Sequence, residues 1–258
     1  MGRLEVCGKE LDIDLVIFDK DGCLFESKAF WTGLAESRAI RLAAATSEEI
    51  ALDWLNLVGM PARRVENGGL VIYGCDPMGP LALAPPSEEI IICASVILKE
   101  TGWRWPKCRE TAEAVFYEAD RNLDLDKCIV PRKGFPGVFE RLSKAGVPFG
   151  IATSDEEGRA RASIGKYTDL GALSFIVTPE DVVHNKPDRE TIDLIAGRFG
   201  IKDNSRILMV GDSYVDMLMA RSAGAYGMGV PEFPESREEM RPYASFIAGS
   251  LDELRIAE

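Results

Sequence analysis

The chain contains 258 residues, of which 46% are hydrophobic and 28% are charged. This composition is typical of a globular protein with a sizeable core and argues against a disordered, collagen-like or membrane-spanning chain. Its 42 acidic and 30 basic residues give a formal net charge of −12, which argues against binding to nucleic acid or to an anionic membrane. Any anionic substrate must therefore be attracted by local positive charge or by a bound metal ion.

The chain length predicts one large domain that carries a substantial insertion. Residues 1–14 include too many charged side chains for the apolar segment of a secretory signal. The longest mainly apolar stretch, residues 90–98, is too short to span a bilayer and predicts a buried helix. We therefore expect a cytoplasmic protein, either a monomer or a homodimer.

The cysteine and histidine content narrows the chemistry. Six cysteines lie far apart without a C-x-x-C pair, which favours free, buried thiols over a zinc site or a disulfide framework. The single histidine, His184, excludes a histidine-rich metal site, and no G-x-S-x-G sequence is present to carry a nucleophilic serine. An enzyme with this sequence must rely on carboxylates and lysines.

Largely apolar runs that end in small or polar residues predict the buried strands of a parallel sheet. In chain order these runs are residues 13–18, 147–152, 173–177, 206–210 and 226–230. Amphipathic stretches at 137–145, 189–199 and 215–223 predict helices between the later strands. The alternation predicts an α/β fold with a Rossmann-like, doubly wound parallel sheet.

The region between the first two strands does not follow this alternation. It contains helical patterns at 29–44, 47–57, 87–101 and 109–123, with a Gly/Pro-rich stretch at 68–86 that predicts a loop. We therefore expect a core domain of residues 1–26 and 129–258, split by an inserted, mainly α-helical domain of residues 27–128.

Polar residues follow the predicted strands where ligands of such sheets bind. Asp19, Thr153 and Asp212 stand at strand ends, and Asp21 and Asp216 come shortly after two of them. Asp19 and Asp21 are two positions apart, so their side chains point to the same side of an extended chain. Asp212 and Asp216 are four positions apart, so they share a face if a helix begins between them. Converging carboxylates require a positive partner, and Mg²⁺ is the expected one.

Four segments resemble, in order, the motifs of the haloacid dehalogenase-like hydrolases. They are Asp19-Lys20-Asp21-Gly22-Cys23-Leu24, Ile151-Ala152-Thr153-Ser154, Lys186-Pro187 and Gly211-Asp212-Ser213-Tyr214-Val215-Asp216. Together with the insertion, which corresponds to the helical cap of this family, the resemblance covers nearly the whole chain. Cys23, Asn185 and Asp188-Arg189 depart from the common pattern, but these departures concern packing and loop geometry.

The resemblance implies a role for each catalytic residue. Asp19 is the expected nucleophile, which forms an aspartyl-phosphate, and Asp21 is the expected general acid and base. Thr153 is expected to hydrogen-bond a phosphoryl oxygen, and Lys186 to neutralise the charge of the phosphate and the nucleophile.

The resemblance also implies the metal ligands. Mg²⁺ is expected to bind the side chains of Asp19 and Asp212 and the backbone carbonyl of Asp21, with Asp216 bound directly or through water.

An acid at position 21 favours a phosphatase that acts on a small phosphorylated metabolite, similar to phosphoglycolate phosphatases. Two alternatives stay open. A β-phosphoglucomutase-like phosphomutase has the same motifs, and a phosphate-binding module without turnover is the non-enzymatic alternative.

Other residues near the motifs are weaker candidates. Arg132 and Lys133 lie where the chain returns from the insertion, so either can contact an anionic substrate or simply form a hinge surface. Ser154 can bind phosphate or cap a helix that begins with the acids after it. Lys20 is expected to be solvated.

Overall fold

The computed structural model describes residues 2–66 and 68–257. They divide into two compact units. One unit is formed by the residues up to Ser27 and from Val130 onward, and the other by Lys28–Ile129.

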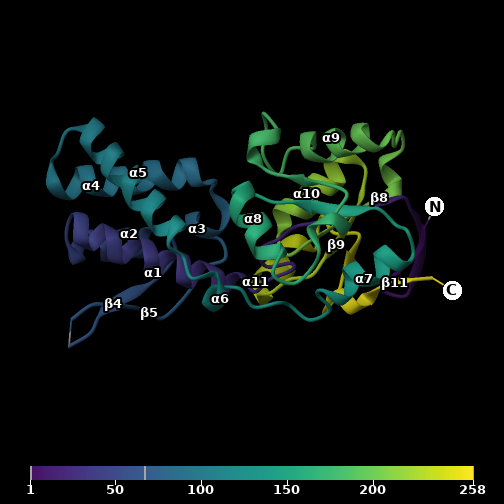
Figure 1. The fold of residues 1–258 in the computed structure, drawn as a ribbon, viewed down its shortest axis with the longest axis horizontal. Helices are drawn as coiled ribbons and strands as arrows, with labels where there is room; N and C mark the ends of the chain where they lie inside the picture. The colour runs from purple at the N-terminus through teal and green to yellow at the C-terminus, as the bar shows by residue number, and fades with distance from the viewer. Residues whose placement is uncertain (1, 67, 258) are drawn as a thin grey trace. The chain divides into compact units, whose positions relative to one another are not determined.

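The first unit is built on a six-stranded parallel sheet with the order β10-β9-β8-β3-β6-β7 (Figure 1). Its strands are β3 (Leu15–Phe18), β6 (Phe149–Ala152), β7 (Ile176–Val177), β8 (Ile207–Gly211), β9 (Tyr226–Gly229) and β10 (Phe246–Ile247). Its helices are α7 (Gly137–Lys144), α8 (Glu157–Ile164), α9 (Glu190–Phe199), α10 (Tyr214–Ala223) and α11 (Pro234–Met240). Short 3₁₀ helices occur at η1 (Leu170–Ala172), η2 (Pro179–Asp181), η3 (Asn204–Arg206) and η4 (Leu251–Glu253). This architecture confirms the expected α/β class.

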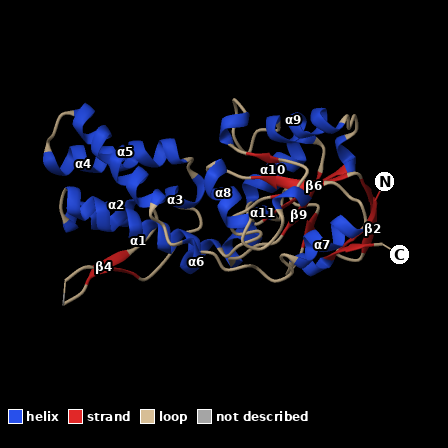
Figure 2. Cartoon of the chain, in the orientation of Figure 1, coloured by secondary structure: helices blue, strands red, loops and turns tan. Residues whose placement is uncertain are grey.

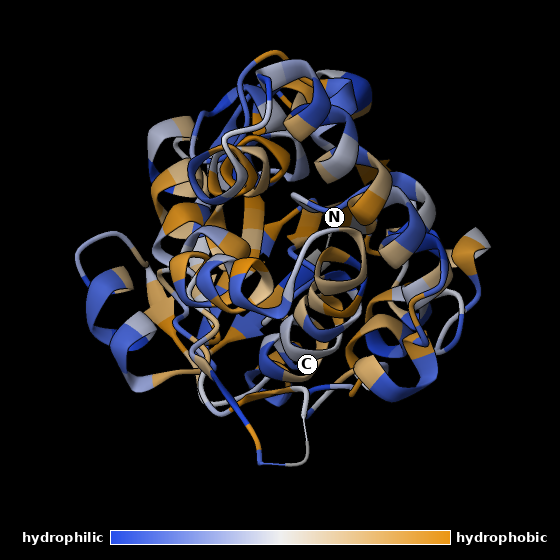
Figure 3. Ribbon diagram, turned by 90° about the vertical axis from the view of Figure 1, so that its left-hand side faces the viewer, coloured by the Kyte–Doolittle hydropathy of each residue, from blue (hydrophilic) through white to orange (hydrophobic). Residues whose placement is uncertain are grey.

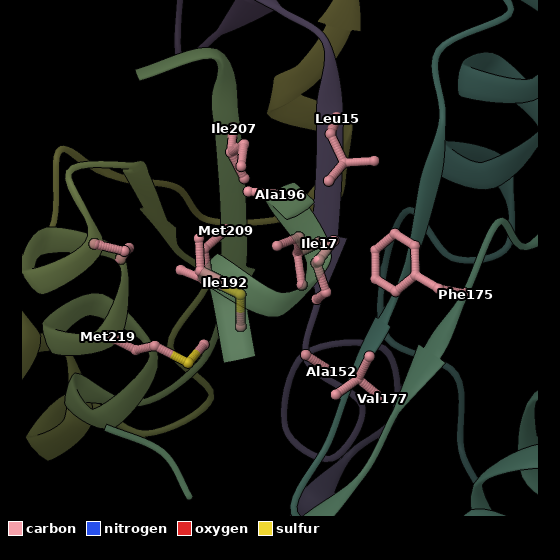
Figure 4. Packing of buried hydrophobic residues seen from close by; sticks show 13 residues of the cluster. Leu15, Ile17, Ala152, Phe175, Val177, Ile192, Ala196, Ile207, Met209 and Met219 are labelled. Carbon is pink, nitrogen blue, oxygen red and sulfur yellow. The ribbon is translucent and has the colours of Figure 1, made fainter. Parts of the chain in front are cut away.

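The central strand β3 is buried on both faces because its residues alternate between two apolar layers. Leu15 and Ile17 belong to a cluster with residues of β8, α9 and α10, as Figure 4 shows. On the other side, the Phe18 ring packs against Phe139 of α7 and Phe149 of β6, with centroid distances of 5.1 and 6.4 Å. Figure 3 shows that helices of the chain carry both hydrophobic and hydrophilic residues, as is typical of helices with one buried face.

A three-stranded antiparallel sheet in the same unit was not expected from the sequence. It has the order β11-β1-β2, formed by β1 (Gly2–Val6), β2 (Lys9–Ile13) and β11 (Leu254–Ile256). Cys7 and Gly8 join β1 to β2 and both have positive φ values, 50° and 78°, as a tight two-residue hairpin requires.

The second unit is mainly helical, and Figure 2 shows its helices together with a short hairpin. The helices are α1 (Ser27–Ala45), which begins at the last residue of the first unit, α2 (Glu48–Leu57), α3 (Pro80–Leu83), α4 (Pro86–Thr101), α5 (Trp105–Arg121) and α6 (Leu125–Cys128). The hairpin pairs β4 (Ala62–Arg64) with β5 (Leu70–Ile72). Because β5 and α3 lie within residues 68–86, the prediction of an uninterrupted loop there is wrong.

A buried cation joins the helices of this unit. The guanidinium of Arg38 pairs with Glu89 of α4 at 2.6 Å and with Asp120 of α5 at 2.9 Å, and it lies 4.0 Å from the centroid of the Phe116 ring. Because these two ion pairs connect α1 with α4 and α5, and breaking a buried ion pair is costly, this set helps to hold the three helices together.

Two further expectations concern apolar residues and cysteines. Helix α4 contains the apolar stretch 90–98 but is only partly buried, since Ile91 and Leu98 are 40% and 38% exposed. All six cysteines lie in the described part of the chain and are free, and four of them are buried, as expected.

No helix in the described residues has both the length and the apolar character needed to cross a membrane.

Candidate active site

The sheet topology brings the first and last motifs together. The chain moves from β3 to β6 and β7 on one side of β3, and then to β8, β9 and β10 on the other side. The direction therefore changes between β3 and β8, where open α/β sheets bind their ligands. Asp19 directly follows β3 and Asp212 directly follows β8, and the Asp19 amide donates to the carbonyl of Val210 at 2.8 Å.

Three carboxylates converge at this edge. Asp19, Asp212 and Asp216 each offer an oxygen within 4.8 Å of the others, and all three residues are buried. Asp216 lies in the first turn of α10 and accepts a hydrogen bond from the Ser213 hydroxyl at 2.9 Å. The structure thus brings together three of the four acids that the sequence predicts at this edge, without the side chain of Asp21.

Glycine is required beside this cluster. Gly22 has a φ of +79°, and a Cβ atom at this position would lie closer than 3.0 Å to the Asp212 carboxylate. A Cβ atom on Gly211 would meet the Asp216 carboxylate equally closely. The two glycines therefore allow the backbone to approach the acids directly.

Lys186 supplies the positive charge that the acidic chain otherwise lacks here. Its Nζ donates to Oδ1 of Asp19 and to Oδ1 of Asp216, both at 2.7 Å. Burial works to lower the pKa of Lys186, but the two carboxylates outweigh it and raise this pKa, so the side chain is an ammonium ion.

The electrostatics of the carboxylates fit a hard cation. Burial, opposed by Lys186 and reinforced by Asp216, raises the pKa of Asp19 to about 7. Burial and the charges of Asp19 and Asp216 raise the pKa of Asp212 well above its usual value. Within the described residues, no hydrogen bond or ion pair reaches the Asp212 carboxylate. Such a set of buried oxygen donors with too little positive charge could hold a divalent cation.

The Asp21 side chain lies in a different environment from these three acids. Oδ1 of Asp21 pairs with the ammonium of Lys20 at 2.5 Å, and that ammonium also pairs with Asp155 at 2.9 Å. Burial raises the pKa of Asp21, although Lys20 opposes the shift. Lys20 is 1% exposed, so the expectation of a solvated side chain is wrong. The binding of a metal ion to the Asp21 carbonyl stays a prediction.

The second motif supplies a buried hydroxyl. Thr153 follows β6, and its Oγ1 accepts a hydrogen bond from the Asp155 amide at 3.0 Å. Thr153, Ser154 and Lys186 line the same small cavity. Helix α8 begins at Glu157 with Glu156 as its N-cap, so the interpretation of Ser154 as the cap is wrong. Ser154 is exposed.

Arg132 and Lys133 differ in their surroundings. The Arg132 guanidinium donates to the backbone carbonyls of Gly22, Val230 and Pro231, so it ties the first motif to the loop after β9. Lys133 is exposed and lines a cavity of about 400 Å³ together with Arg132. Substrate contact by either residue stays a prediction.

Lys20, Asp155 and Arg159 were not recognised as functional candidates from the sequence. The available signals were a lysine placed between two acids and an Asp–Arg pair with a spacing of four residues. Neither signal shows that Lys20 is buried, because that depends on how the loop between β6 and α8 places Asp155 beside the first motif.

A family model for haloacid dehalogenase-like hydrolases matches residues 13–224. The chain belongs to this family. The match includes all four motifs and so confirms the resemblance seen in the sequence.

Two relatives of the chain are named as a pyrophosphatase and as a phosphatase. The chain is 33% identical over 146 residues to pyrophosphatase PpaX of Bacillus velezensis, covering 55% of this chain and 66% of that protein. It is 31% identical over 94 residues to N-acetylmuramic acid 6-phosphate phosphatase of Pseudomonas aeruginosa, covering 36% of this chain and 41% of that protein. The alignments thus span less than two thirds of these relatives.

Solved structures share the fold over nearly the whole chain. A putative haloacid dehalogenase-like hydrolase from Bacteroides fragilis has a TM-score of 0.65 at 19% identity, covering 93% of this chain and 98% of that one. A predicted phosphoglycolate phosphatase from Haemophilus somnus has a TM-score of 0.61 at 16% identity, covering 93% and 96%. At these identities the similarity shows the fold alone.

Proposed function

We propose that this hydrolase is a Mg²⁺-dependent phosphatase that acts on a small phosphorylated metabolite through an aspartyl-phosphate on Asp19. The observation that carries the proposal is the Lys186 ammonium, 2.7 Å from both Asp19 and Asp216, beside three converging buried carboxylates. Family membership and relatives named as phosphatases support it.

The proposed metal site is formed by the side chains of Asp19, Asp212 and Asp216 and the carbonyl of Asp21. When bound, Mg²⁺ would supply positive charge to the phosphoryl oxygens and to the nucleophile. Lys186 adds one more positive charge at the same place, so Mg²⁺ and Lys186 together would balance the three carboxylates and remove their repulsion of an anionic ester.

In the first step, a carboxylate oxygen of Asp19 attacks phosphorus, and the P–O bond to the leaving group breaks. The bonding electron pair goes to the leaving oxygen, which takes a proton from the Asp21 carboxyl group. Thr153 donates its hydroxyl hydrogen to a phosphoryl oxygen, because its Oγ1 already accepts from the Asp155 amide.

In the second step, Asp21 is a carboxylate and removes a proton from a water molecule. The oxygen of that water attacks phosphorus, the bond to Asp19 breaks, and inorganic phosphate leaves. Asp19 and the protonated Asp21 are thereby restored.

The inserted unit is proposed to act as a cap that selects the substrate and excludes bulk water from the aspartyl-phosphate. Ser154 and Lys133 are both exposed and are the proposed substrate contacts from the core unit. Arg132 already donates to three carbonyls, so its proposed contribution is to hold the substrate-binding loops.

The test is release of inorganic phosphate from p-nitrophenyl phosphate, with Mg²⁺ and with a chelator. The wild type is expected to be active only with Mg²⁺, and Asp19→Asn to be inactive. Asp53→Asn, which changes an exposed acid of α2, is the matched control and is expected to keep full activity. Equal activity of Asp19→Asn and the wild type would refute the proposal.

A further inference from the structure

A second buried ion network lies next to the three carboxylates, and it connects Asp21 with Lys20, Asp155 and Arg159, whose side chains have no part in the mechanism above. The Lys20 ammonium is placed between Oδ1 of Asp21, at 2.5 Å, and Oδ2 of Asp155, at 2.9 Å. The other oxygen of Asp155 accepts from Nε of Arg159 at 2.6 Å and from the Glu156 amide at 2.8 Å. Lys20, Asp155 and Arg159 are all buried.

This network is anchored at its far end. Arg159 lies on α8, and its Nε and one terminal nitrogen both contact Oδ1 of Asp155, so two charge-assisted contacts hold this oxygen. With Asp155 fixed, the Lys20 ammonium is also held, since it bridges Asp155 and Asp21. These contacts therefore connect the Asp21 carboxyl group to α8, the helix that follows the second motif, and restrict the rotation of the Asp21 side chain.

Asp155 also acts on Thr153. Its backbone amide donates to Thr153 Oγ1 at 3.0 Å, which leaves the hydroxyl hydrogen for another acceptor. One residue thus connects Asp21, through Lys20, with Thr153, through the backbone. These are the proton donor and the phosphate-binding hydroxyl of the proposed reaction.

Stability is not the only role that this arrangement can have. A buried ion pair is weak evidence of stabilisation, because apolar residues of similar volume often serve as well. What the Lys20 ammonium supplies, and an apolar side chain does not, is a fixed hydrogen bond to the Asp21 carboxyl group.

We propose that Lys20 and Asp155 are positioning residues that hold Asp21 in place to protonate the leaving group. This inference rests on the proposed phosphatase function. Neither residue contacts the reacting atoms, so their effect must pass through Asp21 and must depend on how much the leaving group needs a proton.

The test compares kcat/KM for phenyl phosphate and p-nitrophenyl phosphate, two aryl esters of similar size. Phenolate is the more basic leaving group and needs the proton, whereas p-nitrophenolate leaves readily without it. For Lys20→Met we expect kcat/KM to fall ~10²-fold with phenyl phosphate and less than about 3-fold with p-nitrophenyl phosphate. Lys20→Arg, which keeps a cation, is expected to restore much of the activity toward phenyl phosphate.

Asp155→Asn provides a second test that does not depend on the folding of Lys20→Met. It keeps Lys20 and the shape of residue 155, so we expect the same direction and a smaller fall, about 3- to 10-fold, for phenyl phosphate. Lys202→Met, which changes an exposed lysine far along the chain, is the control and is expected to leave both esters unaffected. Circular dichroism verifies that each variant is folded.

The outcomes separate this inference from the proposed function. If the wild type hydrolyses both esters and each variant loses activity equally on both, or on neither, the positioning role is refuted while the phosphatase stands. If the wild type hydrolyses neither ester with Mg²⁺, the proposed function fails, and this inference fails with it.

Discussion

Replacing Gly22 by alanine tests the geometry of the carboxylate cluster. The new Cβ atom would lie closer than 3.0 Å to the Asp212 carboxylate, so that carboxylate must move by about 1 Å. A displacement of that size in a catalytic group costs ~10²-fold in rate. The left-handed backbone of Gly22, with φ at +79°, adds a strain of about 1–2 kcal/mol.

Gly8 offers a matched control, because its φ is +78° and a Cβ atom there would meet nothing within 4 Å. Gly8→Ala carries the same backbone strain without disturbing the site. We expect both variants to lose stability in urea unfolding, Gly22→Ala more than Gly8→Ala because of the added clash, and only Gly22→Ala to lose kcat/KM for p-nitrophenyl phosphate, by ~10²-fold. Full activity in Gly22→Ala, or an equal loss in Gly8→Ala, would refute the assignment of Asp212 to the site.

Three further predictions concern charged side chains. Lys186→Met removes the ammonium that contacts Asp19 and should lower kcat/KM by at least ~10²-fold, measured by phosphate release, while Lys202→Met should not. Lys20 and Arg159 outweigh burial and lower the pKa of Asp155 from 3.8 to about 2, so its charge stabilises the fold by about 2 kcal/mol above pH 4. This contribution is lost as the pH falls from about 4 to about 2, so the stability gap between the wild type and Asp155→Asn, measured by urea unfolding, should narrow over that range; an unchanged gap would contradict the assignment. Arg38→Met should destabilise the inserted unit by about 3–5 kcal/mol in urea unfolding followed by fluorescence, because all four tryptophans lie within that unit; an unshifted transition would mean that the buried network carries no such role.

Much of the sheet and of the site could be predicted because both depend on local patterns. A strand buried on both faces appears as a continuous apolar run, and the acid that ends it stands at the edge where ligands bind. Asp19 and Asp212 follow neighbouring strands, so the sheet order alone brings them together.

The missed features are strand pairings and side-chain contacts that the apolar pattern of a single segment does not show. In the antiparallel sheet, β1 and β2 form a short local hairpin that the sequence analysis overlooked, whereas β1 pairs with β11 across most of the chain, and a pairing over such a separation leaves no local signature. The Gly/Pro-rich stretch 68–86 looked like a loop, yet β5 forms there because Leu70–Ile72 pairs with Ala62–Arg64. Lys20 likewise looks like a surface lysine in the sequence, because only the fold places Asp155, in the loop after β6, beside its ammonium.

The most direct test of the account is chemical trapping of the intermediate. Sodium borohydride reduces an acyl phosphate to an alcohol, so an aspartyl-phosphate at position 19 would be recovered as homoserine by peptide mass spectrometry. We predict that homoserine forms at position 19 only when wild-type protein turns over p-nitrophenyl phosphate with Mg²⁺, and not in Asp19→Asn. Turnover without any modification of Asp19, or modification at Asp21 instead, would contradict the account.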